Sequence, residues 1–155
     1  MIKATKFSFG GTAAIVTNMA LIIGLDAATA TKSAIVSGLL IVALADNLTD
    51  SLSIHIYQEA ERLEVRDAFR STLANFATRL LVSLTFVLLV LALPVATAAI
   101  VSVFWGVLLL VVLSIVIARQ RLVSAASEVV KHLTAAAAVL LVSHTIGAWI
   151  PTHFG

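Results

Sequence analysis

The feature that most constrains this chain is an apolar stretch from Leu80 to Ala118 in which no residue is charged. A helix crosses the hydrocarbon core of a bilayer with roughly 20 apolar residues, so this stretch is long enough for two crossings. Pro94 lies near its middle, and proline disfavours helix in the residue before it. The stretch therefore predicts two spanning helices, 74–93 and 98–118, joined by a tight turn at the proline.

The composition of the whole chain agrees with a membrane location. Of its 155 residues, 61% are hydrophobic and only 12% are charged, whereas a typical soluble domain has about 25% charged residues. The mean hydropathy is +1.10. A small soluble protein leaves a large share of its surface in water and could not hide so much apolar surface. We expect an all-α, multi-pass integral membrane protein, a single domain over residues 1–155 whose first partner is the lipid bilayer.

Three further segments are long and apolar enough to span: 7–25, 33–57 and 133–150. The first follows two lysines and could be mistaken for a signal peptide, but its length and its polar Thr17 and Asn18 favour a helix that stays in the membrane. Between the second and third spans, residues 58–73 are rich in charge. Their spacing predicts a short charged helical connector in the cytoplasm.

Eight basic residues fall on one side of this five-helix arrangement: Lys3, Lys6, Arg62, Arg66, Arg70, Arg119, Arg121 and Lys131. Lys32 falls on the other side. Cytoplasmic loops carry an excess of lysine and arginine, so we expect the N-terminus in the cytoplasm and the C-terminus outside. Arg79, just inside the third span, is expected to extend its charged group toward the same side.

Composition and motifs exclude several classes of function. The net charge of +2 is too small for a nucleic-acid-binding surface, and the absence of cysteine excludes thiol catalysis and Cys-ligated zinc. The chain has no HExxH, GxSxG or glycine-rich phosphate loop. We expect neither an enzyme, nor a bound cofactor, nor a nucleic-acid partner.

The second span carries most of the polar residues that could have a function. Asp46, Asn47, Asp50 and Ser51 share one helix face, and leucines at spacing four occupy the opposite face. Asp46 is about 13 residues into the span, roughly 20 Å deep. A carboxylate at such depth costs at least about 2.5–3.5 kcal/mol, so these side chains face the protein interior or a water-filled cavity.

Two carboxylates one helical turn apart could bind a hard divalent cation or share a proton. We take Asp46 and Asp50 as the candidate metal ligands. Other polar residues could line an ion pathway beside them: Asn47, Ser51, Ser53, His55 and Asn18. A structural alternative remains, in which the two aspartates are hydrogen-bonded across helices or paired with Arg79.

The order of elements resembles the vacuolar iron transporter family. The segment 9–25 is similar to that family's first helix, which reads F-G-x-N-D-G-L-V-T-T-x-x-L-x-x-G, and segment 37–61 is similar to its second helix and the acidic stretch after it. Leu93-Pro94 matches the turn after the third helix, and segment 131–149 is similar to the last helix. The resemblance implies a dimeric, five-helix exporter of ferrous iron or manganese, coupled to protons.

The chain departs from the family at its metal-binding positions. The acidic residue of the first helix falls on Ala13, and the second-helix pattern S-M-x-x-G-E-Y aligns its methionine with Asp50, its glutamate with Ile54 and its tyrosine with His55. The long glutamate-rich helices of the iron-storing members are reduced to the connector 58–73. A carboxylate in place of a thioether favours harder ions.

Two hypotheses about function follow. The first is a membrane transporter of divalent metal ions of the iron or manganese type, coupled to protons, in which Asp46 and Asp50 bind the metal when ionised and release it when protonated. In this case a homodimer would shield the two aspartates. The second is a membrane scaffold or partner subunit that retains the fold without transporting.

Overall fold

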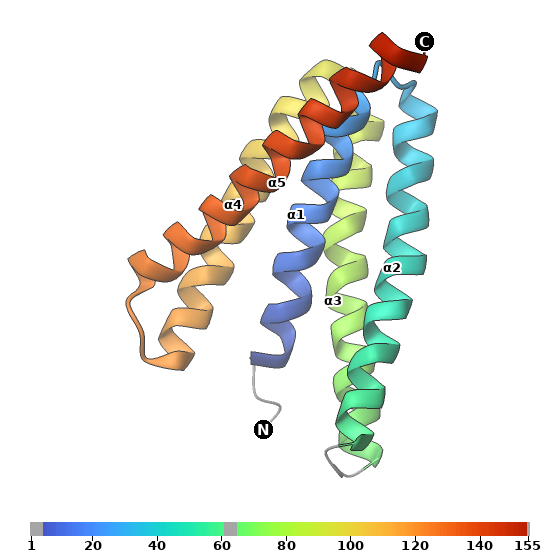
Figure 1. Ribbon diagram of the computed structural model, residues 1–155. Helices are drawn as coiled ribbons and strands as arrows, with labels where there is room; N and C mark the ends of the chain where they lie inside the picture. Colours follow the sequence, from blue (N-terminus) through green and yellow to red (C-terminus); the bar gives the residue numbers. More distant parts are fainter. Residues whose placement is uncertain (1–4, 61–64, 155) are drawn as a thin grey trace.

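The computed structural model of the chain describes residues 5–60 and 65–154, and it is helical over nearly all of them (Figure 1). Five helices follow one another: α1 (Thr5–Ala27), α2 (Lys32–Ala60), α3 (Val65–Ala92), α4 (Val95–Arg121) and α5 (Ala125–Phe154). All five are long and apolar enough to cross a membrane. The predicted all-α, five-helix, multi-pass architecture is thereby confirmed.

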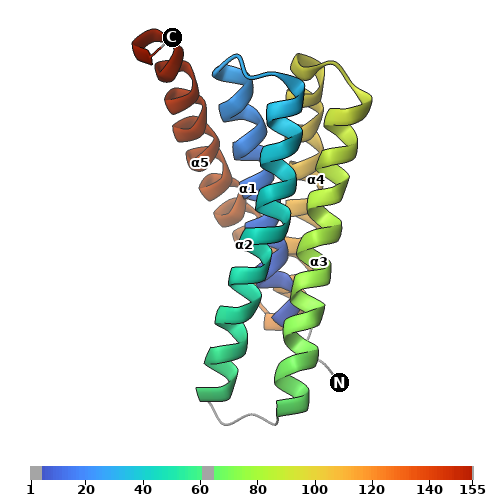
Figure 2. The same cartoon turned by 90° about the vertical axis from the view of Figure 1, so that its right-hand side faces the viewer.

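Helix α1 lies in the middle of the bundle and packs against the four other helices (Figures 1 and 2). Helices α2 and α3 form one antiparallel pair on one side of it, and α4 and α5 form a second pair on the other. The α1–α2 and α3–α4 turns and the end of α5 lie at one end of the molecule, and the α4–α5 turn lies at the other (Figure 1). We call the end with the α4–α5 turn the basic end.

The apolar core lies between α1 and the four other helices, and it includes much of the half of the bundle away from the basic end. Met19, Ile22, Ile35, Leu39 and Phe86 are fully buried there. Outward-facing leucines of α2 at spacing four, namely Leu44, Leu48 and Leu52, are each more than half exposed. Because lipid is as apolar as these side chains, their exposure is what a membrane-embedded surface requires.

The predicted turn at Pro94 is present. Helix α3 ends at Ala92, and Pro94 is the N-cap of α4 with φ −57° and ψ 147°. At the other end of α4, Leu122 takes a left-handed conformation with φ 55° and closes the helix, its amide donating to the carbonyl of Ala118. This left-handed closure is a common helix ending.

The two predicted spans on either side of the charged connector 58–73 lie within longer helices. Most of the predicted connector 58–73 belongs to helix ends, since α2 continues to Ala60 and α3 begins at Val65, while residues 61–64 lie outside the described part. Only residues 122–124 separate α4 from α5. Charged residues can extend a helix into water, so an apolar span marks the membrane crossing and not the end of the helix.

The described basic residues are distributed as the sequence predicted along the helices. The basic end carries the start of α3, the end of α4 and the start of α5, with these side chains: Arg66, Arg70, Arg119, Arg121 and Lys131. Lys32 is the first residue of α2, at the opposite end. Lys3 and Arg62 lie outside the described residues.

Helices α1 and α5 approach each other through small residues. A Cβ atom added to Gly147 would overlap the carbonyl oxygen of Gly24 and would lie 3.1 Å from the Cβ of Ala27. Ser143, one turn earlier in α5, donates a hydrogen bond of 2.5 Å to the carbonyl of Ala20. Small residues are the usual means of close helix packing in membranes.

We expect Gly147→Val to lower the free energy of unfolding by about 1–3 kcal/mol, because the obstacle is backbone and cannot move aside as a side chain would. The measurement is thermal unfolding of purified protein in detergent. Ala148→Val, at an exposed neighbouring position, is the matched control and should leave the midpoint unchanged. Equal midpoints for the two variants would contradict the close contact.

The orientation inferred from basic residues can be measured with single cysteines, because the chain has none of its own. Ser127→Cys lies near the basic end and Thr152→Cys near the opposite end, and both positions are exposed. In whole cells we expect a membrane-impermeant maleimide to label Thr152→Cys directly and Ser127→Cys only after permeabilisation. The reverse pattern would invert the orientation.

Candidate functional site: two aspartates on a buried arginine

The side chain of Arg79, in the middle of α3, is buried inside the bundle with only 2% of its surface exposed. Four oxygen atoms from α1 and α2 surround its guanidinium group. Nη2 lies 2.7 Å from Oδ2 of Asp46, and Nη1 lies 2.5 Å from Oδ2 of Asp50. Nε donates to Oδ1 of Asn47 over 2.7 Å, and Nη1 also donates to the carbonyl of Gly10 over 3.4 Å.

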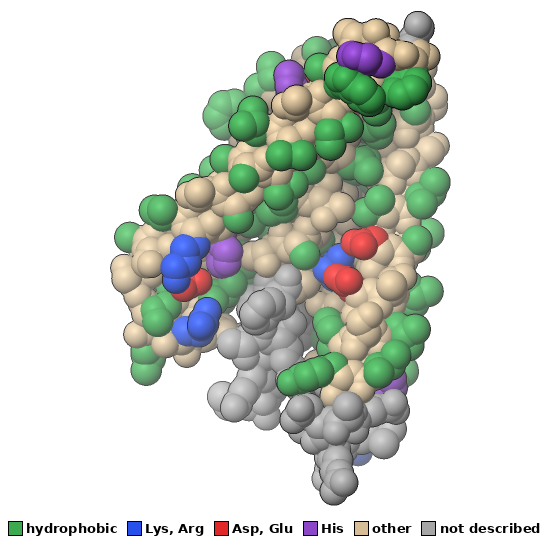
Figure 3. All heavy atoms as spheres, viewed as in Figure 1, with side chains coloured by type: hydrophobic (Ala, Val, Ile, Leu, Met, Phe, Trp, Pro, Cys, Tyr) green, Lys and Arg blue, Asp and Glu red, His purple; other side chains and the backbone are tan. Residues whose placement is uncertain are grey.

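The face of α2 explains this convergence. Ala43, Asn47 and Ser51 repeat at spacing four and are buried, because they face α3. Asp46 and Asp50 precede Asn47 and Ser51 by one position each, so they lie at the edge of this face. Their side chains reach Arg79 with one oxygen yet remain 45% and 47% exposed. In Figure 3, acidic and basic side chains gather over α2 and again near the α4–α5 turn.

The charges at this site do not cancel. Two carboxylates face one guanidinium, and among the described residues neither aspartate has a second basic partner. With both carboxylates ionised, the site carries one excess negative charge at a depth where charge is expensive. A proton or another cation would neutralise it.

The structure selects between the two roles that the sequence left open for Arg79. The expectation that its charged group extends toward the cytoplasmic side is wrong, because the guanidinium is held inward by the four oxygens. The ion pairs across helices correspond to the structural alternative. Two carboxylates one turn apart attract the guanidinium strongly enough to hold it inside.

A stripe of buried polar residues on α3 was missed in the sequence. Ser71, Asn75, Arg79 and Ser83 follow each other at spacing four, and each is at most 4% exposed. Such a repeat places all four on one helix face. Their regular spacing, inside a span that is otherwise apolar, was the signal that Arg79 faces inward.

Asn75 is tightly packed beside Arg79. A Cβ atom at Gly10 would overlap Oδ1 of Asn75 and lie 3.1 Å from Cδ of Arg79, so both side chains border the same glycine. Nδ2 of Asn75 donates to Oγ of Ser51 over 3.4 Å, while its Oδ1 is buried and has no hydrogen-bond partner in the described part of the chain. An oxygen that lacks a donor therefore lies next to the arginine.

The other candidate pathway residues are divided between the interior and the surface. Asn47 and Ser51 belong to the site, and Asn18 is buried one turn further along, where Nδ2 donates to Oγ of Ser83 over 2.9 Å. His55 lies 3.5 Å from Oγ1 of Thr72 through its Nδ1. Ser53 is exposed and donates to the carbonyl of its own helix at Thr49, so it does not line the site.

A second charged cluster closes the α4–α5 turn. Glu128 is buried near the start of α5, 3.2 Å from the ammonium of Lys131 and 3.9 Å from the guanidinium of Arg121. One turn on, His132 shares a hydrogen bond of 2.7 Å with Ser114 of α4. These contacts join α4 to α5, and a glutamate in the first turn also suits the helix dipole.

No ready-made cluster of metal ligands occurs in residues 5–60 and 65–154, since nowhere do three or more His, Asp or Glu side chains come together.

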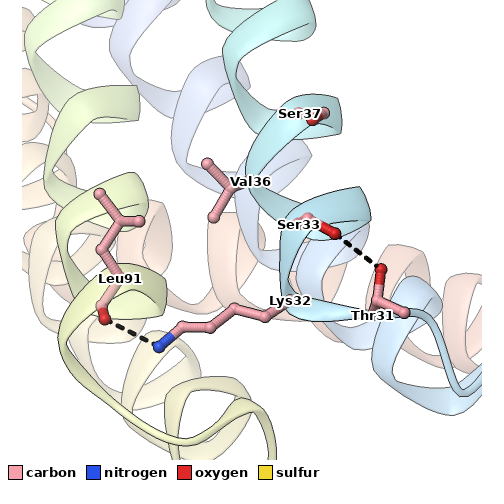
Figure 4. Close-up of a pocket in the computed structure, with 6 residues that line it drawn as sticks. All are labelled: Thr31, Lys32, Ser33, Val36, Ser37 and Leu91. Atoms are coloured by element: carbon pink, nitrogen blue, oxygen red, sulfur yellow. Dashed lines mark hydrogen bonds between the residues drawn. The ribbon is translucent and has the colours of Figure 1, made fainter.

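At the end opposite the basic end, an open pocket of about 600 Å³ is bordered by Thr31, Ser33, Ser37 and Lys32 (Figure 4). The ammonium of Lys32 donates to the carbonyl of Leu91 over 2.8 Å and covers the end of α3. No carboxylate lines this pocket, so it offers nothing to a cation.

Comparison with family models, curated proteins and solved structures gives no match to this chain. The site must therefore be interpreted from its own geometry.

Replacing Arg79 by leucine would leave both aspartates without a basic partner. Loss of one member of a buried ion pair costs roughly 3–5 kcal/mol; because both carboxylates are about half exposed, we expect about 2 kcal/mol here. Thermal unfolding in detergent measures the loss. The triple variant Asp46→Asn/Asp50→Asn/Arg79→Leu should recover most of it, since no charge then remains at the site.

Arg119→Leu removes an exposed arginine at the basic end and serves as the control. A loss no larger than that of the control would contradict the ion pairs.

Proposed function

We propose that this protein carries a cation across a membrane, and that Asp46 and Asp50 bind it. The substrate we propose is a divalent metal ion of the iron or manganese type, exchanged for protons. The observation that supports this proposal is the charge imbalance at the site, where two half-exposed carboxylates share a single buried guanidinium. Pairing the guanidinium requires only one carboxylate, so the second leaves a negative charge that a cation can balance.

The depth of the aspartates supports transport further. Asp46 is about 21 Å and Asp50 about 27 Å from the start of α2 at 1.5 Å per residue, and the hydrocarbon core is about 30 Å thick. Both therefore lie within the membrane, in the half nearer the basic end. Ionisable groups inside a membrane usually mark a path for ions or protons.

The ligand chemistry fits a hard cation. The atoms available around Arg79 are carboxylate, amide and backbone carbonyl oxygens from Asp46, Asp50, Asn47 and Gly10. Oxygen ligands of this kind suit magnesium, calcium and manganese. A proton would compete with the metal for the same carboxylates, which provides a simple basis for coupling.

A second copy of the chain fits the exposure of the site. Lipid cannot solvate the exposed halves of Asp46 and Asp50, so protein or water has to cover them. A homodimer formed along this edge of α2 would enclose both sites and the pathway between them.

The alternative function, a non-transporting scaffold or partner subunit, has one specific observation in its favour. The guanidinium of Arg79 already has four oxygen atoms of two other helices as hydrogen-bond or ion-pair partners. Such a group can simply hold α1, α2 and α3 together, and no metal is needed to explain the cluster.

Flux through proteoliposomes distinguishes the two functions. We expect manganese and ferrous iron to enter proteoliposomes when a proton gradient drives protons out in exchange. The variant Asp46→Asn/Asp50→Asn should abolish this flux. Asp26→Asn removes a carboxylate near the far end of α1 and serves as the matched control, which should retain flux. Each preparation needs a thermal unfolding curve to show that it is folded.

Folded protein that gives no more flux than empty liposomes, with either metal, would refute transport of these ions and favour the scaffold. Loss of flux in Asp26→Asn as well would mean that the assay reports general damage and not the site.

A further inference from the structure

We infer that Arg79 is a tethered competitor of the transported cation: its guanidinium occupies the oxygen atoms that the ion would use, and leaves them when the ion binds. This inference rests on the proposed cation transport and specifies how the same site is controlled. The juxtaposition that carries it is a buried arginine surrounded by the ligands of a hard cation.

The donors around the guanidinium are those a divalent ion would choose. Oδ2 of Asp46, Oδ2 of Asp50, Oδ1 of Asn47 and the carbonyl of Gly10 come from two helices and point at one group. Hard divalent cations take carboxylate and carbonyl oxygens of this type. Guanidinium and metal cannot hold the same oxygens together, so they compete.

Charge balance favours an exchange. With Arg79 in place, the two carboxylates need one further proton to become neutral. With a divalent ion in place and Arg79 withdrawn, the carboxylates are neutral without a proton. The site thus has two neutral states. Passage from the first to the second binds a metal ion and releases one proton, while the guanidinium stays on the chain, keeps its charge and moves away from the carboxylates toward water at the basic end. Metal taken up against a proton released is the exchange that proton-coupled transport requires.

Asn75 gives an independent indication of a ligand. Its Oδ1 is fully buried, has no hydrogen-bond partner among the side chains that the structure describes, and borders Gly10, as the side chain of Arg79 does. Buried polar atoms are rarely left without a partner. When Arg79 withdraws, this oxygen is positioned to bind the cation or a water molecule on it.

A tethered competitor has a predictable effect on affinity. If the state without the guanidinium were populated at about 1%, the apparent affinity for metal would fall about 100-fold. The competitor also assists release, because a tethered group has a high effective concentration at the site. Removal of Arg79 should therefore strengthen binding and slow turnover.

Titration with manganese, followed by electron paramagnetic resonance on purified protein in detergent, tests the inference directly. We expect Arg79→Gln to bind Mn²⁺ about tenfold more tightly than the wild type, or better. Arg79→Lys keeps the charge but offers fewer hydrogen bonds and should fall between the two. Asp46→Asn/Asp50→Asn/Arg79→Gln should lose the added binding, and Arg119→Gln should behave as the wild type does.

Stability provides a second measurement that does not depend on transport. Mn²⁺ should raise the unfolding temperature of Arg79→Gln more than that of the wild type, because it replaces the lost positive charge. If Arg79→Gln cannot be purified, Arg79→Lys decides: tighter binding than wild type supports the competitor, and equal or weaker binding refutes it.

Flux kinetics separate this inference from the proposed function. In proteoliposomes, Arg79→Gln should lower both the KM for Mn²⁺ and the maximal flux, whereas a merely structural role would lower flux without tightening binding. Wild-type flux with no gain of Mn²⁺ binding in the variant would refute the competitor and leave transport intact. A gain of Mn²⁺ binding in the variant without any wild-type flux would refute transport. Arg79 would then be a fixed positive charge that fills the site in place of a metal ion.

Discussion

The burial of one positive charge organises half of this molecule. A charged group within a membrane is tolerated only when it is paired and hydrogen-bonded. Arg79 meets that condition through its ion pairs and hydrogen bonds to α1 and α2. Asn47 and Ser51 must then be small or polar to fit against α3, and Gly10 must lack a side chain because Asn75 and Arg79 occupy the space beside it. Local sequence on three helices follows from this single side chain.

The second pair of helices depends on shape more than on charge. Helix α5 lies against α1 where Gly24 and Gly147 allow the two backbones to approach, and Ser143 adds a hydrogen bond to backbone. At the basic end, α5 is joined to α4 by Glu128, which lies 3.9 Å from the guanidinium of Arg121, and by the hydrogen bond between His132 and Ser114. Among the side chains that the structure describes, the ion pairs near the middle of the bundle are those between α2 and α3, and the candidate site lies there.

The sequence predicted the helices well and the site only in part. Apolar length and Pro94 determined the number of crossings, because both act locally along the chain. The helices extend beyond the predicted spans, because charged residues can continue a helix into water where a membrane span ends. The sequence left the direction of Arg79 open, because a lone arginine can reach water or turn to a partner, and that choice depends on the side chains that α2 presents to it. The repeat of Ser71, Asn75 and Ser83 around it indicates the choice only once the four are considered together.

Biosynthesis meets the same constraint before the bundle is complete. Taken alone, α2 would place two carboxylates in lipid and α3 would place a guanidinium there, and each group costs about 2.5–3.5 kcal/mol on insertion scales. The two helices are consecutive and antiparallel, so the partners can meet as soon as both have been synthesised. Leaving the translocon as a hairpin, with the charges already paired, avoids a penalty that neither helix could avoid alone. The order of the chain, with the acids on one helix and the base on the next, is therefore also an order of assembly.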